Sequence, residues 1–151
     1  MNTDHRGERT VLGFDYGRRR IGVAVGQEIT GTATELASVP AREGVPDWPA
    51  LARLVRRWAP DALVVGVPYH MDGRGHELTG QARRFARQLQ DRFQLPVHEM
   101  DERLSSHEAE AIAAERRAAG HPRRTRKGDI DRLAARIIVE DWLRLQERRG
   151  E

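Results

Sequence analysis

Apolar residues near the start of the chain occur in short segments that are interrupted by turn-forming residues. Residues 10–17 and 20–27 read as two short strands, and Gly17 at their junction favours a tight reversal of the chain. Residues 32–39 form a third segment of this kind, which ends at Pro40. The pattern predicts three strands, of which the first two pair as a hairpin.

The middle of the chain alternates between helical and strand patterns. Residues 40–49 are rich in proline, glycine and charge, which predicts a connector. Apolar residues at helical spacing then mark one face of a helix: Trp48, Leu51, Leu54, Val55 and Trp58. The continuous apolar run over residues 62–67 predicts a strand buried on both faces. A second apolar helical face follows, formed by Leu78, Ala82, Phe85, Leu89 and Phe93.

The last third of the chain predicts one strand and two helices. Residues 96–100 form the strand, and residues 105–119 form a helix that opens with a capping box. The basic residues 121–128 are expected to form a mobile loop. The last helix is expected over residues 130–148, with these side chains turned inward: Leu133, Ala134, Ile137, Ile138, Trp142 and Leu145.

The order of these elements indicates the fold class. An antiparallel start followed by strand–helix–strand crossovers predicts an α/β fold with a mixed five-stranded sheet flanked by helices. The 151 residues are enough for one domain with one core. We expect a single domain over residues 1–151, with flexible ends at about residues 1–9 and 147–151.

The composition limits the cellular compartment and the membrane association that we expect for this protein. The chain has no cysteine, which excludes structural disulfides and thiolate metal sites. The first residues lack the apolar stretch of a signal peptide. The longest apolar run, residues 62–69, is far shorter than the roughly 20 residues that cross a membrane. We therefore expect a cytoplasmic protein without a membrane partner.

The positive charge of the chain is carried almost entirely by arginine, since Lys127 is the only lysine. Guanidinium groups bind phosphate in a bidentate manner. Arginine enrichment also follows from the base composition of a genome, so the distribution of the residues carries more weight than their number. A basic cluster within residues 116–127 is typical of a nucleic-acid-binding surface. The expected nucleic-acid-binding residues are Arg123, Arg124, Arg126 and Lys127.

Acidic residues stand at the ends of predicted elements in three places. Asp15 ends the first strand, Glu102 follows the strand over residues 96–100, and Asp131 lies in the first turn of the last helix. Carboxylates on rigid elements are the ligands that Mg²⁺ or Mn²⁺ uses, with water and substrate phosphate completing the shell. Two such ions about 4 Å apart can activate the attacking water and stabilise the leaving oxygen. The three acids are therefore candidate metal ligands and catalytic residues for phosphodiester cleavage.

Each of these acids also has a purely structural explanation. Asp15 can be a turn residue, and Asp101 with Glu102 can form a solvated loop pair. Asp129 or Asp131 can cap or begin the last helix, where the helix dipole favours an acid. The sequence leaves open whether Asp101 or Asp129 assists as a ligand. The shared placement at element ends, near a basic segment, favours a site.

Motifs in a fixed order cover the chain from about Val11 to Leu145. They are Phe14-Asp15-Tyr16-Gly17, residues 20–26, residues 65–68 with 71–73, residues 101–105 and residues 127–135. In these motifs the chain resembles the YqgF family, the Holliday-junction-resolvase-like proteins also described as pre-16S rRNA nucleases. The resemblance implies a ribonuclease-H-like fold in a cytoplasmic bacterial protein. It also implies a metal-assisted nuclease site at Asp15, Glu102 and Asp131 that matures the 5′ end of 16S rRNA.

Several functions are compatible with these residues. A metal-dependent endonuclease acting on precursor 16S rRNA in the pre-ribosome and a resolvase-like nuclease acting on branched DNA would use the same acids. A ribosome-assembly factor that binds RNA without cleaving it would not use the acids for chemistry. A nucleotide-binding module ranks last, because such modules need a second comparable half and the chain is too short for one. We expect a monomer or a weak homodimer.

Overall fold

The computed structural model describes residues 7–69, 75–101 and 127–149 of the chain. Within these ranges six strands form one mixed sheet with the order β4-β3-β2-β1-β5-β6. The antiparallel part consists of β1 (Thr10–Asp15), β2 (Arg20–Gln27), β3 (Thr32–Arg42) and the short β4 (Val45–Pro46). The parallel part adds β5 (Ala62–Val67) beside β1 and β6 (Val97–Asp101) beside β5.

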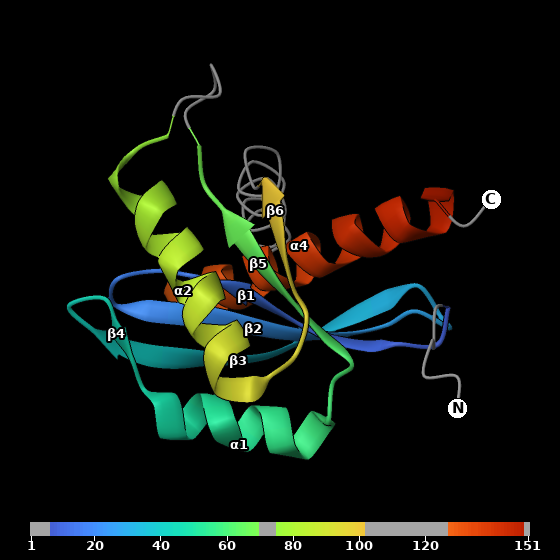
Figure 1. Cartoon of the computed structure of the whole chain (residues 1–151), viewed down its shortest axis with the longest axis horizontal. Helices are drawn as coiled ribbons and strands as arrows, with labels where there is room; N and C mark the ends of the chain where they lie inside the picture. Colours follow the sequence, from blue (N-terminus) through green and yellow to red (C-terminus); the bar gives the residue numbers. More distant parts are fainter. Residues whose placement is uncertain (1–6, 70–74, 102–126, 150–151) are drawn as a thin grey trace, which may run out of the picture.

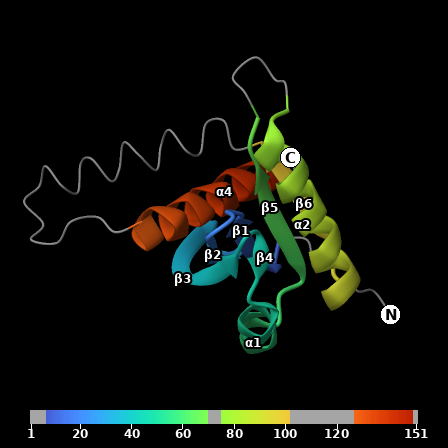
Figure 2. The same cartoon turned by 90° about the vertical axis from the view of Figure 1, so that its left-hand side faces the viewer.

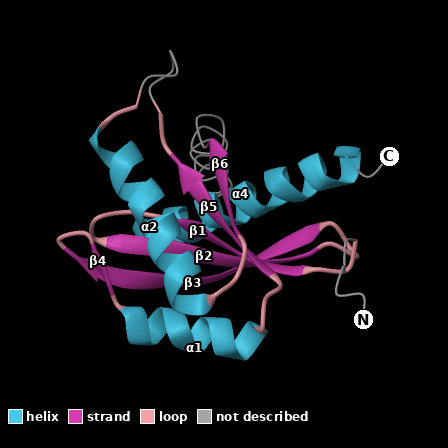
Figure 3. Ribbon diagram, viewed as in Figure 1, coloured by secondary structure: helices cyan, strands magenta, loops and turns pink. Residues whose placement is uncertain are grey.

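Helices lie on both faces of this sheet, as Figures 1 and 3 show. The helices α1 (Trp48–Trp58) and α2 (Glu77–Phe93) lie on one face. The helix α4 (Lys127–Arg149) crosses the other face, which the view in Figure 2 also shows. α1 begins after Asp47, whose carboxylate accepts a hydrogen bond from the Ala50 backbone N–H at 3.1 Å and so caps the helix.

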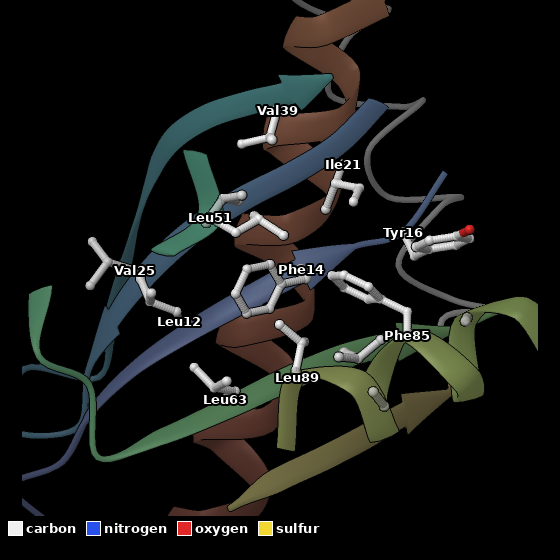
Figure 4. Close-up of a cluster of buried hydrophobic side chains, with 14 residues drawn as sticks. Leu12, Phe14, Tyr16, Ile21, Val25, Val39, Leu51, Leu63, Phe85 and Leu89 are labelled. Atoms are coloured by element: carbon white, nitrogen blue, oxygen red, sulfur yellow. The ribbon is translucent and has the colours of Figure 1, made fainter. Parts of the chain in front are cut away.

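The larger apolar cluster fills the space between the sheet and the layer of α1 and α2 (Figure 4). Alternate residues of β1 and β2, among them Leu12, Phe14 and Ile21, are fully buried in it. The rings of Phe14 and Phe85 meet edge-on, with centroids 5.8 Å apart. Each such buried side chain contributes roughly 1.5–3 kcal/mol. This burial fixes the register of β1, and Asp15 therefore belongs to the opposite face.

Glycine residues allow α4 to lie directly on that opposite face. A Cβ atom on Gly13 or Gly26 would overlap with a methyl group of Val139. A Cβ atom on Gly22 would overlap with the backbone carbonyl of Asp131. Because these strand positions carry no side chain, the backbone of α4 comes into contact with β2 at Gly22.

The strand pattern of the sequence predicted the sheet with one error. The ranges 20–27 and 62–67 are strands as expected, and β5 is buried along its whole length. However, β3 continues to Arg42 and pairs with β4 inside the segment that was predicted to be a connector. The sheet in the described part of the chain therefore has six strands rather than the predicted five. Proline is compatible with β3 at Pro40 because β4 covers only the last residues of this outer strand.

The last helix also differs from its prediction. It begins at Lys127, so this residue and Gly128 are helical rather than part of the predicted basic loop. Leu145 was expected to face inward, but this residue is 39% exposed. The buried stripe follows Ala135, Val139 and Leu143, and Leu145 lies beside that stripe rather than on it. The other five predicted inward residues of this helix are buried.

Other expectations concern segments beyond these ranges. The helix predicted over residues 105–119 lies outside the described residues, as does most of the basic loop predicted over residues 121–128. Among the helices that the structure describes, none is both long enough and apolar enough to span a membrane.

Candidate functional site

The last residue of β1, Asp15, lies at a point where both neighbouring strands carry glycine. Its register partners are Gly22 on β2 and Gly66 on β5. Neither partner has a side chain, so the half-buried carboxylate is not crowded by side chains of the adjacent strands. Alternation along β1 places Asp15 on the face of Val11 and Gly13, which is the face that α4 covers.

The second described acid, Asp131, belongs to α4 and lies against the same part of the sheet. Its backbone carbonyl packs on Gly22, the residue directly opposite Asp15. Its Oδ2 atom accepts a hydrogen bond from Nε of Arg20 at 2.8 Å. The structure thus brings Asp15 and Asp131 to the same end and the same face of the sheet. Since α4 begins at Lys127, Asp131 lies just beyond the first turn rather than within it.

Several predicted site residues lie outside the described ranges. They are Glu102, which follows β6 directly, and the arginines Arg123, Arg124 and Arg126. Lys127 begins α4, but its side chain is not described. Within the described residues, no group of three acidic or histidine side chains is placed to hold a metal ion. Two of the three proposed acids are therefore placed, and the third is not.

The two alternative ligands occupy different positions. Asp101 lies opposite Val67 at the end of β6, and alternation places it on the same face as Glu99. Glu99 accepts a hydrogen bond from Arg83 of α2 at 3.1 Å, so this face is the α2 face and not the face of Asp15. Asp129 lies in the first turn of α4 and forms an ion pair with Arg132 three positions later. The geometry therefore favours Asp15 and Asp131 over these two acids.

Arg20 and Tyr16 adjoin the acids, and neither was assigned a role from the sequence. Arg20 connects β2 to α4 through its hydrogen bond to Asp131. The Tyr16 hydroxyl donates a hydrogen bond to the backbone carbonyl of Gly44 at 2.7 Å. Burial raises the pKa of Tyr16, against an opposing effect of nearby arginines, so its phenol remains a neutral donor. Both residues belong to the motifs at the β1–β2 hairpin. However, only the folded structure shows that Arg20 contacts α4 and that Tyr16 contacts the β3–β4 turn.

This arrangement combines carboxylates with cationic side chains on rigid elements. Oxygen donors from β1 and α4 are suitable for a hard divalent cation. The guanidinium group of Arg20 holds one oxygen of Asp131 in place and leaves its other oxygen, Oδ1, for a further ligand. A divalent cation held by these acids can also bind a phosphate group of a substrate and so orient that phosphate.

Comparison with known proteins gives a consistent result. A family profile described as "RuvX: Holliday junction resolvase" matches residues 9–145. A protein of Azotobacter vinelandii named "Putative pre-16S rRNA nuclease" is 52% identical over 137 residues, which is 91% of this chain and 94% of the relative. A protein of Pseudomonas putida with the same name is 49% identical over 136 residues, or 89% of this chain and 94% of the relative.

Solved structures with a similar fold are Holliday junction resolvases. T. thermophilus RuvC in complex with Holliday junction substrate has a TM-score of 0.54 at 20% identity, covering 93% of this chain and 96% of that chain. The Fowlpox virus resolvase in complex with substrate Holliday junction DNA also has a TM-score of 0.54, at 10% identity, covering 90% and 97%. The predicted ribonuclease-H-like fold is therefore confirmed.

Proposed function

The chain belongs to the RuvX family, which is the YqgF family identified from its motifs, and we propose that it is a nuclease that matures the 5′ end of precursor 16S rRNA. The protein is a hydrolase of phosphodiester bonds. We propose RNA rather than branched DNA as the substrate, because the relatives that share about half of their residues with this chain are named for precursor 16S rRNA. The resolvases that act on branched DNA share its fold at 20% identity or less.

The observation that carries the proposal is the shared position of Asp15 and Asp131. Strand β1 supplies one carboxylate, α4 supplies the other, and Gly22 lets the two elements meet. We propose that Asp15 and Asp131, together with Glu102 after β6, are the catalytic acids and hold Mg²⁺ or Mn²⁺. Their oxygen donors match the preference of these ions. When bound, such an ion supplies Lewis acidity and activates water.

The remaining roles belong to the protein's own groups. Arg20 orients the Asp131 carboxylate through the Nε–Oδ2 hydrogen bond, so that helix and sheet present their acids in a fixed relation. Arg123, Arg124, Arg126 and Lys127 are proposed to bind the phosphates of the RNA, because they directly precede the helix that carries Asp131. The protein is proposed to act in the cytoplasm on the pre-ribosome, as a monomer or a weak homodimer.

A cleavage assay tests the function. Wild-type protein is incubated with precursor 16S rRNA or with a four-way DNA junction, in Mg²⁺, in Mn²⁺ and in EDTA. We expect cleavage of the RNA at its 5′ end with either metal and no cleavage in EDTA. Faster cleavage of the junction would instead support a resolvase. Tight RNA binding without cleavage under any of these conditions would support a non-catalytic assembly factor.

A further inference from the structure

Most arginines near the sheet and α4 have an acidic partner. The pairs that the structure shows within the described residues are Arg9–Glu28, Arg20–Asp131, Arg83–Glu99, Arg132–Asp129, Arg136–Glu35, Arg136–Glu140 and Arg144–Asp141. Arginines in such pairs have part of their charge neutralised, and they stabilise the fold modestly, by about 1 kcal/mol or less at exposed sites. They do not need a ligand to satisfy their charge.

Three exposed arginines at the Asp15 end of the sheet have no acidic partner in the described part of the chain. Arg18 and Arg19 form the turn between β1 and β2, and Arg42 ends β3. The turn begins directly after Asp15 and Tyr16, so it lies at the same end of the sheet as the start of α4 (Figure 1). We name Arg18, Arg19 and Arg42 the hairpin arginines.

The backbone that carries the hairpin arginines is held in place by hydrogen bonds. The Arg19 carbonyl accepts one from the Ala41 N–H at 2.8 Å, and the Arg18 carbonyl accepts one from the Gly44 N–H at 2.9 Å. Gly17 is needed for the tight turn, because a Cβ atom there would lie 2.6 Å from the Arg20 carbonyl oxygen. The hydrogen bond from Tyr16 to Gly44 fastens the β3–β4 turn to the same place. The three side chains therefore extend from a backbone platform, the β1–β2 turn with the end of β3, that these hydrogen bonds hold in place.

A further arginine, Arg84 of α2, adds positive charge near this turn, where Glu43 is the neighbouring acid in the sequence. Arg18 and Arg84 of α2 both act on the Tyr16 hydroxyl, so a fourth guanidinium group lies near the turn. Arg84 is exposed and likewise has no acidic partner among the described residues. A cluster of guanidinium groups on a fixed backbone, with no acidic partner in residues 7–69, 75–101 and 127–149, is suited to bind phosphate oxygens in bidentate pairs.

We propose that the hairpin arginines bind the phosphate backbone of the RNA substrate and hold it beside Asp15 and Asp131. This inference rests on the proposed function, and it assigns to the β1–β2 turn a second phosphate-binding surface, separate from residues 123–127. The hairpin surface lies on the sheet, whereas the predicted basic segment precedes α4.

The test compares two triple variants that remove the same charge. The variant R18Q/R19Q/R42Q removes the hairpin arginines, and R53Q/R56Q/R57Q removes three exposed arginines of α1 that lack an acidic partner in the described structure. Binding of a fluorescein-labelled RNA of roughly 20 nucleotides is measured by anisotropy in EDTA, between about 50 and 300 mM KCl. Circular dichroism melting shows that each variant is folded.

We expect the hairpin variant to lower the slope of log affinity against log salt by about 2, at roughly 0.7 per lost phosphate contact. Its affinity at about 0.1 M salt should fall roughly 100-fold. The α1 variant should keep the wild-type slope. The variant R18K/R19K/R42K, which keeps the charge, should recover most of the slope. An unchanged slope in the hairpin variant, or an equal loss in the α1 variant, would overturn the inference.

These binding results are independent of cleavage, because EDTA removes the divalent ions. A folded hairpin variant with wild-type binding, alongside a wild-type protein that cleaves RNA, would refute the inference and leave the proposed function intact. A protein that never cleaves RNA, but whose salt slope falls in the hairpin variant, would refute the proposed function and support the surface.

Discussion

The two ends of the β1–β2 hairpin differ in how their charged side chains are paired. At the end where β1 begins, Glu28 accepts hydrogen bonds from Nε of Arg9 at 2.7 Å, from a second guanidinium nitrogen at 3.1 Å and from backbone N–H groups. The Arg9 and Glu28 side chains are only 17% and 8% exposed, and Arg9 also stacks over Trp142. At the end where β1 finishes, the Arg20–Asp131 pair is more open, at 35% and 21%.

From this contrast we infer that the Arg9–Glu28 end stabilises the fold and that the Asp15 end is the proposed site. At the Arg9–Glu28 end the two opposite charges pair with each other and are mostly buried, so neither side chain needs a ligand. The Asp15 end combines acids from two elements with guanidinium groups that have no acidic partner in the described residues. Guanidinium groups without an acidic partner in the described residues are available to bind phosphate. Substitutions at the Asp15 end should therefore change activity, and substitutions at the Arg9–Glu28 end should change stability.

Removal of the Asp15 charge should have the largest effect on activity. In Asp15→Asn the volume is kept and one anionic oxygen is lost, so cleavage of precursor 16S rRNA should fall below detection. The free energy of unfolding should stay the same or rise slightly, because neighbouring carboxylates repel each other when no ion lies between them. Single-turnover cleavage and urea unfolding measure the two quantities. Cleavage at the wild-type rate would make Asp15 only a turn residue.

Gly22→Ala should reduce both activity and stability. Its methyl group would overlap with the Asp131 carbonyl, so α4 must shift away from β2 at the acids, at a cost of about 1–3 kcal/mol. Gly26→Ala is the matched control, because its methyl group would overlap with Val139 and lie in tight contact with Leu143 further along α4. Both variants should melt at lower temperature, but only Gly22→Ala should lose cleavage when assayed well below its melting temperature. Equal losses of activity would refute this distinction.

Arg20→Gln should lower cleavage by roughly 10- to 100-fold, because Asp131 loses the partner that orients it. The control is Arg136→Gln, which removes the hydrogen bond to Glu35 between α4 and β3. That control should leave cleavage nearly unchanged. The loss for Arg20→Gln should appear in kcat at saturating RNA rather than in KM, and a pure KM effect would indicate that Arg20 binds RNA instead.

Glu28→Gln should affect stability alone. The charged hydrogen bonds from Arg9 would be weakened, at a cost of roughly 1.5–3 kcal/mol in the free energy of unfolding. Burial acts to raise the pKa of Glu28, but the bonds from Arg9 and Gly7 outweigh it and lower this pKa below 4.5. The stabilisation is therefore present above pH 4.5 and is lost as the pH falls through the lower, folded-state pKa. Urea unfolding between neutral and acidic pH should show this loss in the wild type and not in Glu28→Gln.

The sequence predicted most of the fold because local patterns determine most of its elements. The apolar run over residues 62–67 and the helical spacing of Ala82, Phe85 and Leu89 each reflect one buried face. The short strand β4 was missed because two residues carry no periodic pattern, and it forms only because β3 extends beyond Pro40.

The site was less predictable because it depends on contacts between distant segments. The positions of Asp15 and Asp131 at element ends suggested a site, but their common neighbour Gly22 is apparent only from the packing of α4. The pairing of Arg20 with Asp131 spans 111 positions of sequence, so no local pattern predicts it. The same holds for the hairpin arginines, because only the folded structure shows that they have no acidic partner among the described residues.

Manganese binding to the RNA-free protein tests most directly whether Asp15 and Asp131 form one metal site. Electron paramagnetic resonance counts free Mn²⁺ during titration of the wild type, Asp15→Asn, Asp131→Asn and Glu28→Gln. We expect the wild type and Glu28→Gln to bind Mn²⁺ alike, and each of the two aspartate variants to lose the bound ion. Wild-type binding in both aspartate variants, in proteins that melt normally, would contradict a shared site at this end of the sheet.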